Sequence, residues 1–201
     1  MPPLPLSPEQ IAALVIATSF AAGLNVYGTV ATLGLLSRAQ LVVLPSALDV
    51  VASWWVIGAC ATLFVIEFFA DKVPAFDLVW NALQTFVRVP VGALLAYGAA
   101  AQLSPGWQVA AAGAGGLIAF AAHGGKTAVR AAVTASPEPF SNIALSFGED
   151  AFAIFLTWFA TRHPFIAAGI AIVCLVVIVI LVRWIVRALR ALFRGASGQL
   201  A

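Results

Sequence analysis

Apolar residues fall into a small number of long stretches along the chain, separated by short segments rich in proline, serine and charged residues. A helix that crosses a membrane needs about 20 consecutive, mostly apolar residues. The pattern therefore predicts an all-α membrane protein with about six hydrophobic segments. These segments cover approximately residues 11–36, 50–70, 79–101, 107–133, 142–160 and 164–192.

Glycine interrupts two of these segments. The first is longer than one crossing requires, and Gly23-Leu24-Asn25 lies near its middle, which favours a break, a strong tilt or a re-entrant hairpin. The fourth contains Gly124-Gly125 directly after His123. We expect both segments to be glycine-broken or re-entrant, with free backbone N–H groups where the helix of the fourth segment restarts.

Three short matches in the same order relate the two halves of the chain. They predict one transmembrane domain over 1–201, built from a first repeat, 7–101, and a second repeat, 104–194, unless they are a coincidence of composition. With three crossings in each half, the second repeat is inverted relative to the first, as in many transporters. The matches are Ser7-Pro8 with Ser104-Pro105, FAAGLNVYGTVA (20–31) with FAAHGGKTAVRA (120–131), and FADKVP (69–74) with FATRHP (159–164).

The composition excludes an ordinary soluble domain. Of the 201 residues, 63% are apolar and 9% are charged, against about 45–50% and about 25% in soluble globular proteins. Arginines at positions 183, 187, 190 and 194 lie on one helical face at the end of the last segment. The positive-inside rule places that end in the cytoplasm, which predicts a multi-pass inner-membrane protein. Six crossings put the N-terminus in the cytoplasm as well, whereas re-entrant segments change the parity.

Several longer motifs are similar to those of a known family. They are FFADKVPAFDLVWNALQTFVRVP, HGGKTAVRAAV, SPEPFSN and LTWFATRHP. From about Ile11 to Arg183 the chain resembles a bacterial membrane family known only as a domain of unknown function, number four-one-two-six. The resemblance implies an integral membrane protein of several helices. Because the family carries no established activity, it transfers no catalytic or binding residue.

One helical stripe of basic residues lies at membrane depth. His123, Lys126 and Arg130 are spaced i, i+3 and i+7, and a charge at the bilayer centre costs about 2.5–3.5 kcal/mol. Such groups face protein or water, unless Lys126 and Arg130 extend to the headgroups from a helix near the interface. Gly124 and Gly125 allow close backbone approach, so the stripe favours an anion-binding site. Because the unperturbed pKa of histidine is about 6.5, we expect binding at His123 to depend on pH.

Other polar residues are candidates to complete this site or to pair with it. Asn25 occupies the matching break in the first half and offers hydrogen bonds, although a helix cap is an equally good interpretation. Glu149 and Asp150 lie within the fifth segment, where one of them is expected to pair with Lys126 or Arg130. That pair is either structural or a gating carboxylate. Glu67 and Arg88 form a second candidate pair between neighbouring segments.

The sequence favours no enzyme, metal or cofactor class. It contains no H-E-x-x-H, G-x-S-x-G, P-loop or Cys/His metal spacing. The C-terminal basic stripe is juxtamembrane, which indicates lipid contact rather than nucleic acid. Two functions remain: a transporter, channel or lipid flippase whose broken helices bind a small anion or a phosphate-bearing headgroup, and a non-transporting scaffold or accessory subunit. They differ in whether the glycine breaks face a hydrated cavity or packed side chains. The partners expected are membrane lipids, with a homo-oligomer left open.

Overall fold

The computed structural model describes residues 6–70, 74–134 and 139–197, and these residues form eight helices and no strand. The all-helical class predicted from the sequence is confirmed for this part of the chain. The helices are α1 (Pro8–Leu24), α2 (Val26–Arg38), the 3-10 helix η1 (Ser46–Ala52), α3 (Trp54–Ala70), α4 (Pro74–Ala99), α5 (Pro105–Thr134), α6 (Pro139–Arg162) and α7 (Pro164–Ser197).

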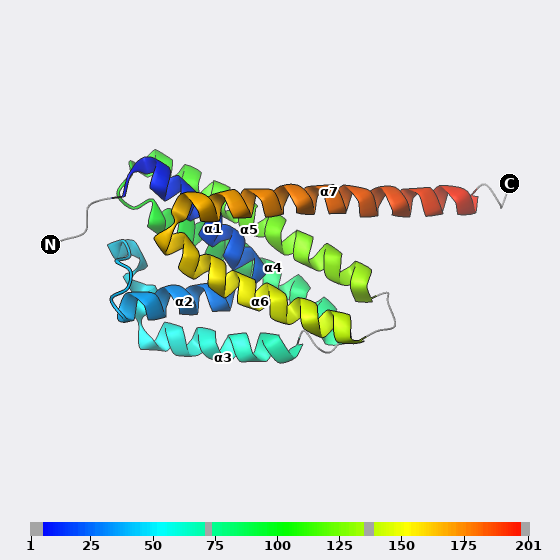
Figure 1. The fold of residues 1–201 in the computed structure, drawn as a ribbon, viewed down its shortest axis with the longest axis horizontal. Helices are drawn as coiled ribbons and strands as arrows, with labels where there is room; N and C mark the ends of the chain where they lie inside the picture. The colour runs from blue at the N-terminus through cyan, green and yellow to red at the C-terminus, as the bar shows by residue number, and fades with distance from the viewer. Residues whose placement is uncertain (1–5, 71–73, 135–138, 198–201) are drawn as a thin grey trace.

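The first two helices form a hairpin that enters and leaves the bundle at the same end (Figure 1). Helix α1 runs into the bundle, the chain reverses at Asn25, and α2 returns to the end at which α1 began. The five long helices that follow run alternately from one end to the other. The start of α1 and the end of α7 therefore lie at opposite ends of the molecule.

Local capping explains why α1 and α2 are separate helices. Helix α1 starts with a capping box, in which the Ser7 hydroxyl accepts from Gln10 N and the Gln10 side chain accepts from Ser7 N. It stops at Asn25, whose backbone is extended, with φ −148° and ψ 103°. The side chain of Asn25 then caps α2 by accepting a hydrogen bond from Gly28 N at 2.8 Å. The break predicted at Gly23–Asn25 is confirmed.

The predicted break in α5 is wrong. Helix α5 continues without interruption through Gly124 and Gly125 to Thr134. Two glycines inside a helix cost about 0.5–1 kcal/mol each relative to alanine, but packing decides the outcome here. A Cβ atom on Gly125 would overlap the side chain of Ile178 in α7, so the glycine permits close approach of the two helices rather than a break.

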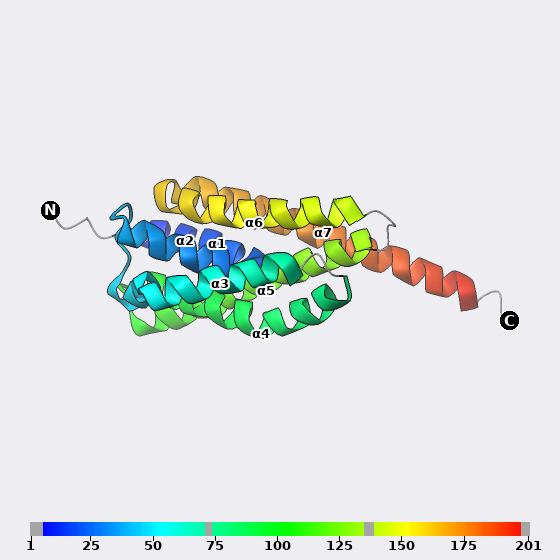
Figure 2. The same cartoon turned by 90° about the horizontal axis from the view of Figure 1, so that it is seen from below.

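The hairpin lies at the centre of the fold, between α6 and α7 on one side and α3, α4 and α5 on the other (Figure 2). Small residues allow α1 and α4 to approach α5 closely. A Cβ on Gly23 would lie 2.5 Å from Ala119 O, and one on Gly92 would lie 2.6 Å from Ala119 Cβ. Such contacts drive helix association where lipid surrounds the protein, because burial of apolar surface adds little there.

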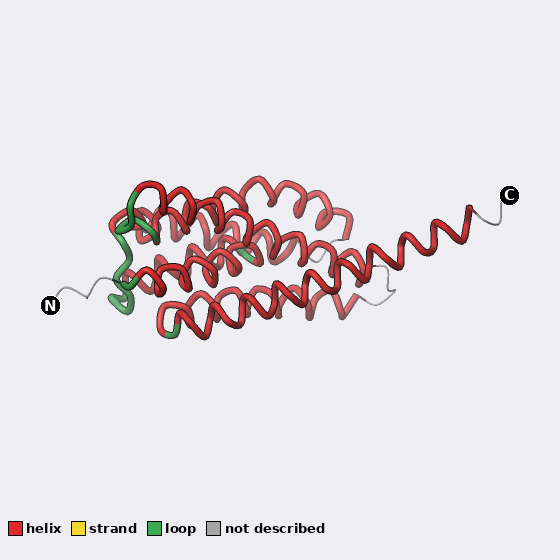
Figure 3. Tube along the Cα trace, turned by 90° about the horizontal axis from the view of Figure 1, so that it is seen from above, coloured by secondary structure: helices red, strands yellow, loops and turns green. Residues whose placement is uncertain are grey.

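Three described helical segments are long and apolar enough to cross a membrane, and the bent pair of η1 and α3 makes a fourth if it counts as one span. Large apolar side chains such as Trp55 and Phe86 point outward, as lipid-facing residues do. Helix α7 extends beyond the rest of the bundle (Figure 3). The chain is therefore a membrane protein.

Six crossing segments and an inverted repeat are not confirmed. Both Ser-Pro starts lie at the same end of the bundle, where they begin α1 and α5, whereas an in-plane two-fold axis places them at opposite ends. The matched stretches 20–31 and 120–131 also differ, since the first folds back at Asn25 and the second is one helix. Residues 71–73 of the third match lie outside the described residues, and the division into 7–101 and 104–194 stays a prediction.

Candidate functional site

Six charged side chains surround the tip of the α1–α2 hairpin, and we call them the charge cluster. Five of them are 3% exposed or less, and the sixth, Glu149, is partly buried. Burial of so many charges at membrane depth is costly and is rare outside functional sites. The members are Glu67 of α3, Arg88 of α4, Lys126 and Arg130 of α5, and Glu149 and Asp150 of α6.

Two cations of the cluster bind the C-terminal end of α1. The guanidinium Nη1 of Arg88 donates to Gly23 O at 2.9 Å and to Leu24 O at 2.8 Å, and Lys126 Nζ donates to Leu24 O at 3.2 Å. The last carbonyl groups of a helix lack partners within it and carry its negative dipole end. Arg88 and Lys126 supply both the missing hydrogen-bond donors and the positive charge, so the hairpin tip is held by charge as well as by packing.

The N-terminal end of α2 is compensated by the opposite charge. Asn25 Nδ2 donates to Asp150 Oδ1 at 2.8 Å, while Asn25 Oδ1 accepts from Gly28 N. A carboxylate near a helix N-terminus is stabilised by the positive dipole end. Asn25 is thus both the helix cap and the link from the hairpin to α6.

The ion pairs expected from the sequence are present. Arg88 pairs with Glu67 through Nη2 and Oε1. Glu149 Oε2 lies 2.8 Å from Arg130 Nη2 and 3.3 Å from Lys126 Nζ, and Lys126 Nζ is also 3.8 Å from Glu67 Oε1. The cluster therefore holds three cations and three carboxylates within the described residues.

Hydrogen bonds assign His123 as the neutral Nε2–H tautomer. Its Nδ1 lies 3.1 Å from Arg88 Nη1, and because a guanidinium only donates, Nδ1 accepts. Its Nε2 lies 2.9 Å from Asn81 O and 3.0 Å from Thr85 Oγ1, so Nε2 carries the proton and donates to the carbonyl. His123 connects α4 to α5 and adds no charge to the cluster.

Gly124 and Gly125 do not form the backbone cradle expected from the sequence. A Cβ on Gly124 would meet nothing within 4 Å, and the residue is exposed on the outside of α5. Gly125 is buried against Ile178. Both lie inside a continuous helix, whose N–H groups are engaged in its own hydrogen bonds. The expected free N–H groups are therefore absent from this part of the described structure.

A second set of polar contacts in the interior was not predicted. Gln84 Nε2 donates to Tyr27 OH at 3.1 Å, joining α4 to α2, and Thr157 Oγ1 lies 3.4 Å from Thr29 Oγ1, joining α6 to α2. The signal for α4 was available: Asn81, Gln84 and Arg88 have the same i, i+3, i+7 spacing as the basic stripe of α5. These contacts extend the polar interior along the hairpin.

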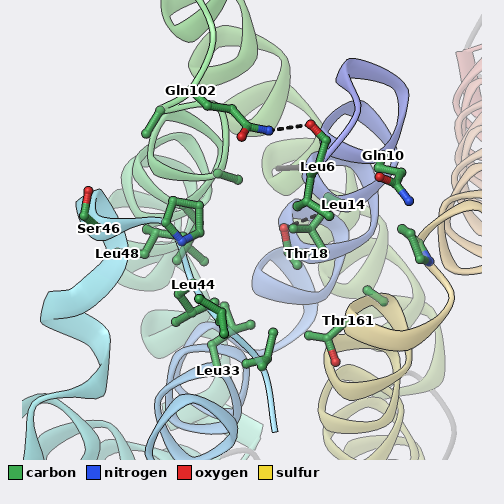
Figure 4. A pocket seen from close by; sticks show the side chains of 18 of the residues that line it. Leu6, Gln10, Leu14, Thr18, Leu33, Leu44, Ser46, Leu48, Gln102 and Thr161 are labelled. Atoms are coloured by element: carbon green, nitrogen blue, oxygen red, sulfur yellow. Dashed lines mark hydrogen bonds between the residues drawn. The ribbon is translucent and has the colours of Figure 1, made fainter. Parts of the chain in front are cut away.

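A cavity of about 590 Å³ opens at the end of the bundle where α1 begins (Figure 4). The close-up shows Gln102 near the start of α1, where its Nε2 donates to Leu6 O at 2.6 Å. The walls of the cavity include residues of α1, α2, η1, α4 and α6 and are mostly apolar, with Thr18 and Thr161 among the polar exceptions. None of the cluster residues lines it.

The described residues contain no group of three or more His, Cys, Asp or Glu side chains that could hold a metal ion.

A family model described as a domain of unknown function (DUF4126) matches residues 12–184. The chain belongs to the DUF4126 family. Every member of the charge cluster lies inside the matched region, as does Asn25. No curated protein and no solved structure matches the chain.

Proposed function

We propose that this DUF4126 protein transports a small solute across the inner membrane, and that the α1–α2 hairpin tip and the charge cluster form its closed gate. The observation that carries the proposal is the burial of three cations and three carboxylates around a broken helix. Secondary transporters place their sites where discontinuous helices end inside the bundle.

Stability alone does not explain such a cluster. A buried ion pair is often no more stabilising than apolar residues of the same volume. Charged side chains inside membrane proteins instead mark ion and substrate pathways. The cluster lies inside the bundle rather than on its lipid-facing surface, which favours a small solute over a lipid headgroup.

The cavity at the other end of the hairpin supports a path. Its wall includes Thr18 of α1 and Leu33 of α2, so the cavity follows the hairpin inward from the bundle end. We place the gate between this cavity and the opposite membrane face. In this closed arrangement the hairpin tip is held by Arg88, Lys126 and Asp150.

We also propose an orientation. Arg183, Arg187 and Arg190 lie on the far part of α7, so the positive-inside rule puts that end in the cytoplasm. With a re-entrant hairpin followed by five crossings, the start of α1 lies on the other face. This replaces the cytoplasmic N-terminus expected from six crossings, and it makes the 590 Å³ cavity open to the outside.

A disulfide lock tests the gate. Thr29 and Thr157 face each other across α2 and α6 with their Oγ1 atoms 3.4 Å apart, so Thr29→Cys/Thr157→Cys suits a cross-link. The native Cys60 and Cys174 are first replaced by alanine. In liposomes, solute flux is expected to fall on oxidation and to return on reduction, while Thr29→Cys alone is insensitive. Unchanged flux in the cross-linked protein would show that the hairpin is not part of the gate.

A scaffold without transport is the second candidate, and the packing of two glycines favours it. Gly23 is packed against Ala119 and Gly125 against Ile178, rather than facing a described cavity. In this case the charges only fix helix positions. The absence of flux for every solute in a panel of inorganic ions, carboxylates, phosphates and amino acids would establish this alternative over the first.

A further inference from the structure

We propose that Glu149 is the displaceable occupant of a binding site for a small anion, formed by Lys126 and Arg130. When the Glu149 side chain moves away, the anion takes the place of its carboxylate. Passage of the anion through the bundle rests on the proposed transport function, but its binding does not.

Three donors converge on one oxygen of Glu149. Oε2 lies 2.8 Å from Arg130 Nη2, 3.1 Å from Arg130 Nε and 3.3 Å from Lys126 Nζ. Charge-assisted contacts of this kind are the strong ones that proteins use to hold anions. Because all three are directed at a single atom, the geometry fits a monatomic anion or one oxygen of a small oxyanion.

Glu149 is the carboxylate of the cluster that is best placed to leave. Its side chain is 11% exposed, whereas those of Lys126 and Arg130 are 0% and 2% exposed. Next to it, Gly148 faces open space and Phe147 is exposed. The donors are therefore fixed in the interior, while the acceptor reaches them from the edge.

The other two carboxylates have structural partners at the hairpin. Asp150 accepts from Asn25 at the tip, and Glu67 pairs with Arg88, which itself holds the end of α1. Removal of either would release the hairpin. In the described residues Glu149 forms ion pairs with Lys126 and Arg130. Its departure therefore leaves the hydrogen bonds to the hairpin intact.

The test uses the full-length protein in liposomes, with chloride as the probe and acetate and phosphate as further arms. Glu149→Gln removes the charge of the occupant and should give chloride flux at neutral pH at least about tenfold above wild type. Asp49→Asn makes the same charge change on exposed η1 and should behave as wild type.

A binding measurement separates this inference from transport. Chloride should raise the thermal unfolding temperature of Glu149→Gln more than that of the wild type, and Lys126→Met/Glu149→Gln should lose this increase. If Glu149→Gln cannot be purified, Glu149→Ala makes the same comparison. A variant without the Glu149 carboxylate that does not respond to chloride would overturn the site. Chloride binding without flux of any solute would keep the site and refute transport.

Discussion

Asn25 Nδ2 and Asp150 Oδ1 are hydrogen-bonded at 2.8 Å inside the bundle, although 125 positions separate the two residues in the chain. The bond joins the reversal point of the hairpin to the middle of α6. It places a carboxylate at the N-terminal end of α2, while Arg88 and Lys126 bind the C-terminal end of α1. Each half-helix dipole thus ends on a charge of the opposite sign.

The first prediction is an energetic coupling between Asn25 and Asp150. Asn25→Ala removes the cap of α2 and the bond to α6, and Asp150→Ala removes the bond from the other side. A double-mutant cycle, measured by unfolding in detergent, should give a coupling of about 1–3 kcal/mol, the range for hydrogen bonds to charged groups. The control is Thr161→Ala, because Thr161 lies 11 residues, or about 16 Å, further along α6 than Asp150. The effects of Thr161→Ala and Asp150→Ala on the free energy of unfolding should be additive. A coupling energy for Asn25 and Asp150 no larger than that of the control pair would contradict the contact.

The second prediction concerns Arg88, which is fully buried and contacts Glu67, His123 and the end of α1. Arg88→Met should destabilise the protein by about 3–5 kcal/mol, because the buried Glu67 carboxylate loses its closest cation and is left with the longer contact to Lys126, at 3.8 Å. Glu67→Gln in the same protein should recover part of the loss. The recovery is incomplete, since the carbonyl groups of Gly23 and Leu24 still lack their donor.

Arg183→Met is the matched control, because Arg183 is exposed on α7. Its effect should stay within about 0.5 kcal/mol. If the double variant Arg88→Met/Glu67→Gln were less stable than Arg88→Met alone, the result would contradict a stabilising pair between Arg88 and Glu67.

Local sequence signals predicted the break in the hairpin but not the continuity of α5. Asn25 is a strong helix cap, and the structure uses it as one. Gly124-Gly125 destabilises a helix locally by an amount similar to the contribution of such a cap. The helix nevertheless continues, because Gly125 packs against Ile178, 53 positions away in the chain. No property of the segment itself reveals that partner.

The pairing of charges was predictable in part. Charges at membrane depth must find opposite charges, and this argument predicted the Arg88–Glu67 pair and a pair between one of the two acids of α6 and Lys126 or Arg130. It left open that Glu149 is the acid and that it pairs with both cations. It did not predict that Arg88 and Lys126 also bind the carbonyl groups at the end of α1. That role depends on the reversal of the chain at Asn25, on which the proposed number of crossings and the proposed side of the N-terminus also rest.

The third prediction contrasts two adjacent glycines. Gly125→Ala should destabilise the protein, because the new methyl group would overlap Ile178 and separate α5 from α7. Gly124→Ala should be neutral or stabilising by about 0.4–1 kcal/mol, because its site is open and alanine has less freedom to lose. Unfolding in detergent compares the two variants. A stabilising Gly125→Ala with a destabilising Gly124→Ala would reverse the assignment of their faces.

The central claim is that the α1–α2 hairpin enters and leaves at one membrane face, and single-cysteine labelling from each side of the membrane tests it most directly. Glu9 and Gln40 are exposed at the two ends of the hairpin, and Arg187 is exposed on the far part of α7. In a protein without Cys60 and Cys174, cysteines at positions 9 and 40 should react with an impermeant thiol reagent from the same face, and a cysteine at 187 from the other. A single crossing over residues 11–36 instead puts positions 9 and 40 on opposite faces, with 187 on the side of 9, and that result would contradict the account.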